Sequence, residues 1–386
     1  MTNFLGSYLG VWFFCFSMKL LFQFLFILLI LAKAQAASSA DEQARFLAGL
    51  NVDGCGLEPL AREQAWQDHA AEFHRAWSDL EERQLSQIRT WMPSSCAYIY
   101  SDPSPLFYMF SGPDFLYANA FYASASTYIL CGREPVGMIP DVTMLSSEAR
   151  SAALKNMRTA LNAILSFSFF ITADMKTDLT QTQLSGTLPV LYVFLSRMGC
   201  RIEEVKLVGL TASGELTQEK SKTPGVRITF HGTTGNTQTL YYFTTDLSNW
   251  GIKANPGFMQ FCDKQGVGNG FAKAASYLMH SNEFSTVRDF LLNKTRHMVQ
   301  DDSGIPFQFF KESDWMMSLY GHYAGPIDLF KQHEQADLRA AFAVEKSGDL
   351  PFGVGYQWRP GVSSLMISTS MRQVPKAEAV AEPVRE

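Results

Sequence analysis

The sequence predicts an α+β (mixed α/β) protein: a largely antiparallel sheet with helices packed on it, preceded by a long amphipathic helix. Short apolar runs bounded by Gly and Pro, at residues 106–110 and 127–131, are typical of interior strands. Apolar residues recur at helical spacing over residues 60–92. Strand-like segments joined by turn residues over 201–245 indicate an antiparallel meander.

The composition is that of a folded chain with a large core. Of the 386 residues, 47% are hydrophobic and 13% aromatic, which is more apolar material than a single small core holds. The formal net charge is −5 and only 18% of residues are charged. Because nucleic-acid binding requires a clustered basic face, no nucleic-acid partner is expected.

The N-terminus has the features of a secretory signal peptide over residues 1–36. Lys19 precedes a long apolar run, and Ala34-Gln35-Ala36 provides a small-residue cleavage site. Met18 is an alternative start. The sequence therefore predicts an exported protein, periplasmic or secreted. The other interpretation is an uncleaved anchor, since residues 5–32 are long enough to span a bilayer; membrane contact is expected only through this segment.

A helical segment is predicted over residues 37–95, with the long amphipathic helix at 60–92 and Pro93 as its stop. Its apolar stripe consists of Trp66, Ala70, Phe73, Trp77, Leu80, Ile88 and Trp91. An α/β body follows over 96–374, and a disordered polar tail over 375–386. Cys55 and Cys96 flank the long helix in turn-like contexts and form the best candidate disulfide of an exported chain.

The order of elements within the body follows from periodicity and turn residues. Glycine-rich residues 266–270 precede a predicted helix, and we interpret them as a helix–helix turn rather than a phosphate cradle. After the strands at 106–110 and 127–131, helices are predicted at 146–167, 169–178 and 183–198, strands at 201–212, 226–231 and 237–245, helices at 255–270, 271–280 and 284–293, a strand at 305–310, helices at 314–322 and 328–344, and a hairpin at 352–358 and 363–370.

Polar residues that follow the apolar strands are the candidate site. Ser111 and Asp114 come directly after the first strand, and ligand sites of α/β proteins gather at strand ends. We assign candidate catalytic roles to Ser111, Asp114, Asp302 and His322, with the histidine as general base. The alternative, which this turn favours, is a structural interpretation of Ser111 and Asp114 as turn and helix-capping residues.

A second polar turn, Asp301-Asp302-Ser303-Gly304, stands between two apolar runs. Neighbouring carboxylates push their pKa values apart and can act as acid and base or hold a divalent cation, but the same residues are also ordinary turn formers. We assign ligand-binding roles to Asp301, Ser303, Arg133 and Asp246. No set of metal ligands with a recognisable spacing is present in the sequence, and the sequence leaves the cofactor undetermined.

The familiar catalytic motifs are absent from the sequence, including G-x-S-x-G, the P-loop and H-E-x-x-H. This favours a cell-envelope or periplasmic protein that binds a small molecule or a partner protein. The alternative is an exported hydrolase that uses a Ser/Asp/His pocket at the strand ends, with or without a divalent metal. The hydrolase hypothesis requires at least three of the candidate side chains to converge.

Overall fold

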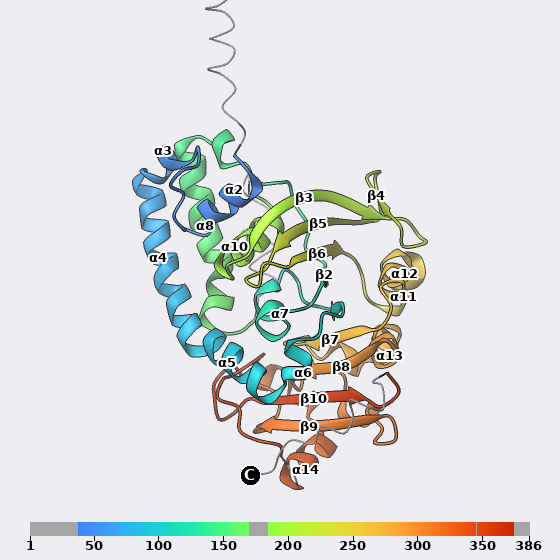
Figure 1. Ribbon diagram of the computed structural model, residues 1–386. Helices are drawn as coiled ribbons and strands as arrows, with labels where there is room; N and C mark the ends of the chain where they lie inside the picture. Colours follow the sequence, from blue (N-terminus) through green and yellow to red (C-terminus); the bar gives the residue numbers. More distant parts are fainter. Residues whose placement is uncertain (1–37, 170–183, 345, 374–386) are drawn as a thin grey trace, which may run out of the picture.

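The structure, a computed structural model, describes residues 38–169, 184–344 and 346–373. One sheet of ten strands runs through the molecule, and helices cover both of its faces (Figure 1). The predicted mixed α+β fold is therefore confirmed. The predicted signal peptide at 1–36, the tail at 375–386 and nearly all of the predicted helix at 169–178 lie outside the described residues.

The sheet has the order β4-β3-β5-β6-β2-β1-β7-β8-β10-β9. Five of its nine strand pairings are antiparallel, in agreement with the prediction, and these lie toward the two ends of the sheet. The five central strands, from β6 to β8, pair in parallel, which the sequence analysis did not foresee. In chain order the strands are Leu106–Tyr108 (β1), Thr127–Gly132 (β2), Arg201–Leu210 (β3), Leu216–Thr217 (β4), Thr223–His231 (β5), Thr237–Thr244 (β6), Gly268–Ala272 (β7), Thr295–Gln300 (β8), Trp315–Gly321 (β9) and Ser364–Ser370 (β10).

Two apolar clusters, one on each face, hold the helices against the sheet. On one face lie α2 (Ala40–Leu47), α3 (Glu58–Ala61), α4 (Gln64–Leu80), α5 (Ser86–Ser95), α6 (Ala97–Tyr100), α7 (Phe115–Phe121), α8 (Ser147–Ser166) and α10 (Leu188–Arg197). On the other lie α11 (Asn249–Ala254), α12 (Gly257–Lys264), α13 (Ser285–Lys294) and α14 (Ala336–Val344). Burial of alternate strand residues on both faces is the main driving force for this layered arrangement.

The long N-terminal helix both begins and ends a few residues later than the predicted 60–92. It runs from Gln64 through a π-helical turn at Glu81–Leu85 to Ser95, so Pro93 does not stop it. Pro93 lies in the last turn of the helix. Proline lacks the backbone N–H that would bond four residues back, but the loss of one hydrogen bond so near the end still allows the last two residues to be helical. Phe73, Trp77 and Leu80 of the predicted stripe are buried against α8 and α10, which confirms their place in the core.

Several predicted elements in the second half of the chain are wrong. The hairpin predicted for 352–358 and 363–370 does not form: residues 364–370 are the strand β10, which pairs with β8 and β9. The glycine-rich residues after α12 form the buried strand β7, not the end and start of helices. Trp315–Gly321 is the edge strand β9 rather than a helix, and residues 305–310 contain a 3₁₀ turn rather than a strand. Small residues are required in β7 because its neighbours approach closely: a Cβ on Gly268 would lie 2.2 Å from the Pro105 carbonyl oxygen.

All five cysteines of the described part of the chain are free thiols, so the pairing of Cys55 with Cys96 is not observed. Cys96 is buried, and burial raises the pKa of its thiol to about 12. Cys55 instead donates a hydrogen bond to the Val52 carbonyl group at 2.8 Å. Among the residues that the structure describes, no helix combines the length and apolar character needed to cross a bilayer.

Candidate functional site

The centre of the sheet contains a point at which the chain reverses its direction of winding. From β1 the chain passes through α7 on one face to β2, which pairs with one side of β1. The strand on the other side of β1 is β7, and the chain reaches it from β6 through α11 and α12 on the opposite face. Parallel α/β sheets bind ligands beyond the carboxyl ends of the strands at such a switch point.

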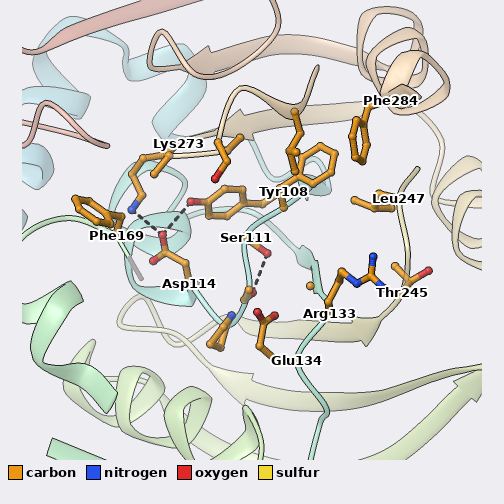
Figure 2. A pocket seen from close by; sticks show the side chains of 18 of the residues that line it. Tyr108, Ser111, Asp114, Arg133, Glu134, Phe169, Thr245, Leu247, Lys273 and Phe284 are labelled. Carbon is orange, nitrogen blue, oxygen red and sulfur yellow. Dashed lines mark hydrogen bonds and ion pairs between the residues drawn. The ribbon is translucent and has the colours of Figure 1, made fainter. Parts of the chain in front are cut away.

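A cavity of about 320 Å³ lies at this place (Figure 2). Four strand-end segments line it: residues 108–114 after β1, 132–134 after β2, 245–247 after β6 and 273–278 after β7. In Figure 2, Lys273, Asp114 and Phe169 lie at one end, and Phe284, Leu247 and Thr245 at the other. The cavity therefore has Lys273 and Asp114 at one end and the apolar side chains of Phe284 and Leu247 at the other, where Figure 2 also shows Arg133.

The turn after β1 is held in a rarely populated backbone conformation. Phe110 has a φ of 60° and Gly112 a φ of 55°, both in the left-handed region. The Ser111 hydroxyl fixes this turn: it donates to the Gly112 carbonyl oxygen at 2.8 Å and accepts from the Cys131 backbone N–H at 3.1 Å. Ser111 lines the cavity but its hydroxyl is committed to the backbone, which agrees with the structural interpretation of this residue.

Asp114 caps α7 and pairs with a buried lysine. Its carboxylate accepts hydrogen bonds from the Tyr117 backbone N–H at 3.1 Å and from the Tyr108 hydroxyl at 2.9 Å. The Lys273 ammonium group lies 2.9 Å from the same carboxylate and 3.9 Å from the centre of the Tyr117 ring. Burial, followed by the charge of Asp114, raises the pKa of Tyr108 well above its usual value.

Glu134 follows β2, and of the acids in the cavity wall its carboxylate has the fewest hydrogen-bond donors. Its side chain is 7% exposed, yet the hydrogen bond known for its carboxylate is a long one of 3.4 Å from the Tyr242 hydroxyl. Its Oε2 atom packs beside Gly132, where a Cβ would come within 2.3 Å of it. A carboxylate has about four acceptor positions, so this group has capacity for donors supplied from the cavity.

Arg133 and Asp246 lie at the mouth of the cavity and face each other. Their side chains form an ion pair at 3.4 Å, and the Arg133 side chain is 70% exposed. The Ser248 backbone N–H, the largest cause, and the Arg133 charge both lower the pKa of Asp246. An ion pair this exposed contributes little to stability, so Arg133 is free to swing toward a ligand.

The Asp301–Ser303 turn follows β8 and lies behind the β7 segment rather than in the cavity wall. Asp301 and Ser303 accept hydrogen bonds from the backbone N–H groups of Ala274 and Ala275, and Asp302 accepts one from the Tyr277 hydroxyl. Burial raises the pKa of both carboxyl groups; that of Asp302 reaches about 7, with the charge of Asp301 as the second cause.

His322 lies apart from the other candidates. It is exposed, follows the edge strand β9, and donates its backbone N–H to the Ser363 carbonyl oxygen at 2.9 Å. No histidine is among the described residues that line the cavity. The structure thus brings Ser111, Asp114, Arg133 and Asp246 to one cavity, places Asp301, Asp302 and Ser303 behind it, and leaves His322 outside.

Three cavity residues were not selected from the sequence. Glu134 stands beside Arg133 after the second strand, where the two could equally be a surface ion pair, and only Arg133 was assigned a role; an acid directly after the second parallel strand is itself a signal of a ribose-binding site. Lys273 and Tyr108 gave no such signal. The position of Lys273 depends on β7, which the sequence analysis interpreted as helix. No known family model, curated protein or solved structure matches this chain.

Proposed function

We propose that this protein binds a small nucleoside-type molecule at the switch point, with the ribose hydroxyl groups on Glu134. The observation that carries the proposal is the Glu134 carboxylate itself. It is buried against the strand ends, lines the cavity and has spare acceptor capacity. Its one donor, the Tyr242 hydroxyl, is distant at 3.4 Å, so a ligand that presents two adjacent hydroxyl groups would fill acceptor positions that are still open.

The position of Glu134 in the fold supports the same ligand class. In doubly wound sheets an acid about 20 residues beyond the glycine turn of the first strand binds the ribose. Glu134 follows Gly112 by 22 residues and lies at the end of the adjacent parallel strand. A nucleoside base would then lie toward the Phe284 end of the cavity, where Phe110 and Phe284 pack edge-to-face at 5.5 Å.

The charges around the cavity disfavour a diphosphate. Its wall carries three acids, Asp114, Glu134 and Asp246, against the two bases Arg133 and Lys273. In addition, the Asp114 carboxylate already occupies the N-terminus of the helix after β1, where a dinucleotide fold places the pyrophosphate. A neutral or cationic nucleoside is therefore favoured, and S-adenosylmethionine has the required diol, a positive sulfonium and no phosphate.

The hydrolase alternative has less support. A serine hydrolase needs a histidine side chain near its nucleophile. The Ser111 hydroxyl is instead bonded to backbone groups, and no histidine is among the described residues that line the cavity. Export of the chain, predicted from residues 1–36, stays a prediction. Ligand binding at the switch point does not depend on it.

Equilibrium dialysis with adenosine, 2′-deoxyadenosine, S-adenosylmethionine and ATP tests the proposal. We expect S-adenosylmethionine and adenosine to bind, 2′-deoxyadenosine to bind roughly tenfold more weakly because one hydroxyl donor is lost, and ATP to bind worst. Equal affinity for adenosine and 2′-deoxyadenosine, or no binding of any of the four at millimolar concentration, would overturn it.

A further inference from the structure

We propose that Asp301, Asp302 and Ser303 are positioning residues, which hold the segment after β7 in the shape that forms one wall of the cavity. This segment, residues 274–277, is named here the β7 loop. The inference goes beyond ligand binding and rests on the proposed function only for its affinity readout. It gives a role to an acidic turn that neither lines the cavity nor faces solvent.

The β7 loop has an unfavourable backbone conformation. Ala274, Ser276 and Tyr277 have φ values of 51°, 53° and 56°, although none of them is glycine. Non-glycine residues rarely adopt this region, and they keep it only when the surrounding structure fixes them. In the described chain the only other non-glycine residue with a positive φ is Phe110, after β1. Phe110, Ala274 and Ser276 line the cavity, and Tyr277 is the neighbour of Ser276 in the chain.

Three hydrogen bonds from the neighbouring strand end fix this conformation. Asp301 Oδ2 accepts from the Ala274 N–H at 2.9 Å, and Ser303 Oγ accepts from the Ala275 N–H at 2.8 Å. Asp302 Oδ2 accepts from the Tyr277 hydroxyl at 2.8 Å. Since β7 and β8 are adjacent parallel strands, three consecutive residues after β8 can reach successive groups of the β7 loop.

The turn that supplies these acceptors is itself held firmly. The Gln300 side chain bridges it, donating to the Ile305 carbonyl oxygen at 2.7 Å and accepting from the Ile305 N–H at 3.0 Å. Gln335 donates to the Asp302 carbonyl oxygen at 3.0 Å. Ser303 is fully buried and donates to Asp301 as well. A fixed turn of this kind can impose a strained conformation on its neighbour.

The β7 loop matters to the cavity because Lys273 precedes it directly. Ala274, Ala275 and Ser276 also line the cavity, and the hydroxyl of Tyr356, another lining residue, lies 2.7 Å from the Ser276 hydroxyl and donates to the Ala274 carbonyl oxygen at 3.1 Å. If the β7 loop relaxed to ordinary φ values, the position of Lys273 relative to Asp114 would change with it. The acidic turn therefore acts on the ligand through the β7 loop and not by contact.

The test compares Ser303→Ala and Tyr277→Phe with Ser221→Ala. Ser221 is a matched control because its hydroxyl also bonds backbone groups, at Leu210 and Thr223, and it does not line the cavity. Two quantities are measured: amide hydrogen exchange of residues 268–280 and of residues 223–244, and the affinity for S-adenosylmethionine. Tyr277→Phe removes only the hydroxyl and keeps the ring that stacks on His333.

We expect exchange in residues 268–280 to become at least about tenfold faster in both variants, with residues 223–244 unchanged, and affinity to fall roughly tenfold. The control should change neither the exchange of residues 268–280 nor the affinity; any effect of it should be confined to the segment that begins at Thr223, whose N–H the Ser221 hydroxyl binds. Exchange that rises equally in both segments would mean general destabilisation and would overturn the proposal, as would wild-type exchange in residues 268–280. If S-adenosylmethionine fails to bind the wild-type protein, the ligand proposal fails, while the exchange result still decides the positioning role.

Discussion

The ammonium group of Lys273 lies 2.9 Å from the carboxylate of Asp114, and the two side chains are 1% and 2% exposed. The two residues come from strand ends on either side of the switch point, after β7 and after β1. Their pairing ties the halves of the central sheet together at their end of the cavity. Four predictions follow from this and from the neighbouring contacts.

Breaking this pair should strongly destabilise the protein. Asp114→Asn removes the carboxylate that forms the ion pair with the buried Lys273 ammonium group, and Lys273→Met leaves Asp114 with neutral donors only, so each should cost about 3–5 kcal/mol. The double variant removes both charges and should be less destabilised than the sum of the two single variants. Urea denaturation of the four proteins measures the coupling; strictly additive losses would argue against a direct interaction.

Gly132→Ala should abolish ligand binding at Glu134 without unfolding the protein. A Cβ at residue 132 would lie 2.3 Å from Glu134 Oε2 and 2.9 Å from the Tyr242 hydroxyl, so the carboxylate has to move. Gly348→Ala is the control, because its nearest neighbour, a Tyr320 ring atom at 3.6 Å, is at ordinary contact distance. Dialysis with S-adenosylmethionine should separate the two variants; similar affinities would show that Glu134 is not where the ligand binds.

Asp302 should make stability depend on pH in the acid range. Its pKa is about 7 in the folded protein, raised by burial and by Asp301, and about 3.9 in an unfolded chain. Between these values the folded state holds a proton that the unfolded state has lost. The free energy of unfolding contributed by Asp302 therefore falls as the pH rises from about 4 to about 7.

The Asp302→Asn variant removes this titration. Its free energy of unfolding, measured by urea denaturation at intervals from pH 4 to pH 8, should decline less than that of the wild-type protein. Some decline should remain, because burial also raises the pKa of Asp301, which is intact in the variant. An unchanged slope would mean that Asp302 is ionised throughout this range in the folded state.

The fold was predictable where local signals and tertiary packing agree. The meander from 201 to 245 and the helix after Phe284 follow the periodicity of their apolar residues, and the helix begun by Ser146 also follows the capping rules. The strand β7 was not predictable in this way, because its sequence Gly-Asn-Gly-Phe-Ala has the glycine content of a loop. Close packing of its neighbours explains the glycines: a Cβ at Gly268 would meet the Pro105 carbonyl oxygen at 2.2 Å, and one at Gly270 would require the Met298 side chain to move.

The candidate site was predictable to the extent that the strands were. Ser111, Asp114, Arg133 and Asp246 follow strands that the sequence analysis located, and all four reach the cavity. Lys273 follows a strand interpreted as helix, so it could not be selected. Placement of the acidic turn at 301–303 behind β7 depends on the parallel pairing of β7 with β8, which no short-range pattern in the sequence specifies.

The central claim is that Glu134 binds the hydroxyl groups of a nucleoside. Titration calorimetry of S-adenosylmethionine into the wild-type protein, Glu134→Gln and the exposed control Glu215→Gln tests it most directly. We predict that Glu134→Gln loses at least roughly tenfold in affinity while keeping the wild-type free energy of unfolding, and that Glu215→Gln binds normally. Wild-type affinity in Glu134→Gln, or no heat of binding to the wild-type protein, would contradict the account.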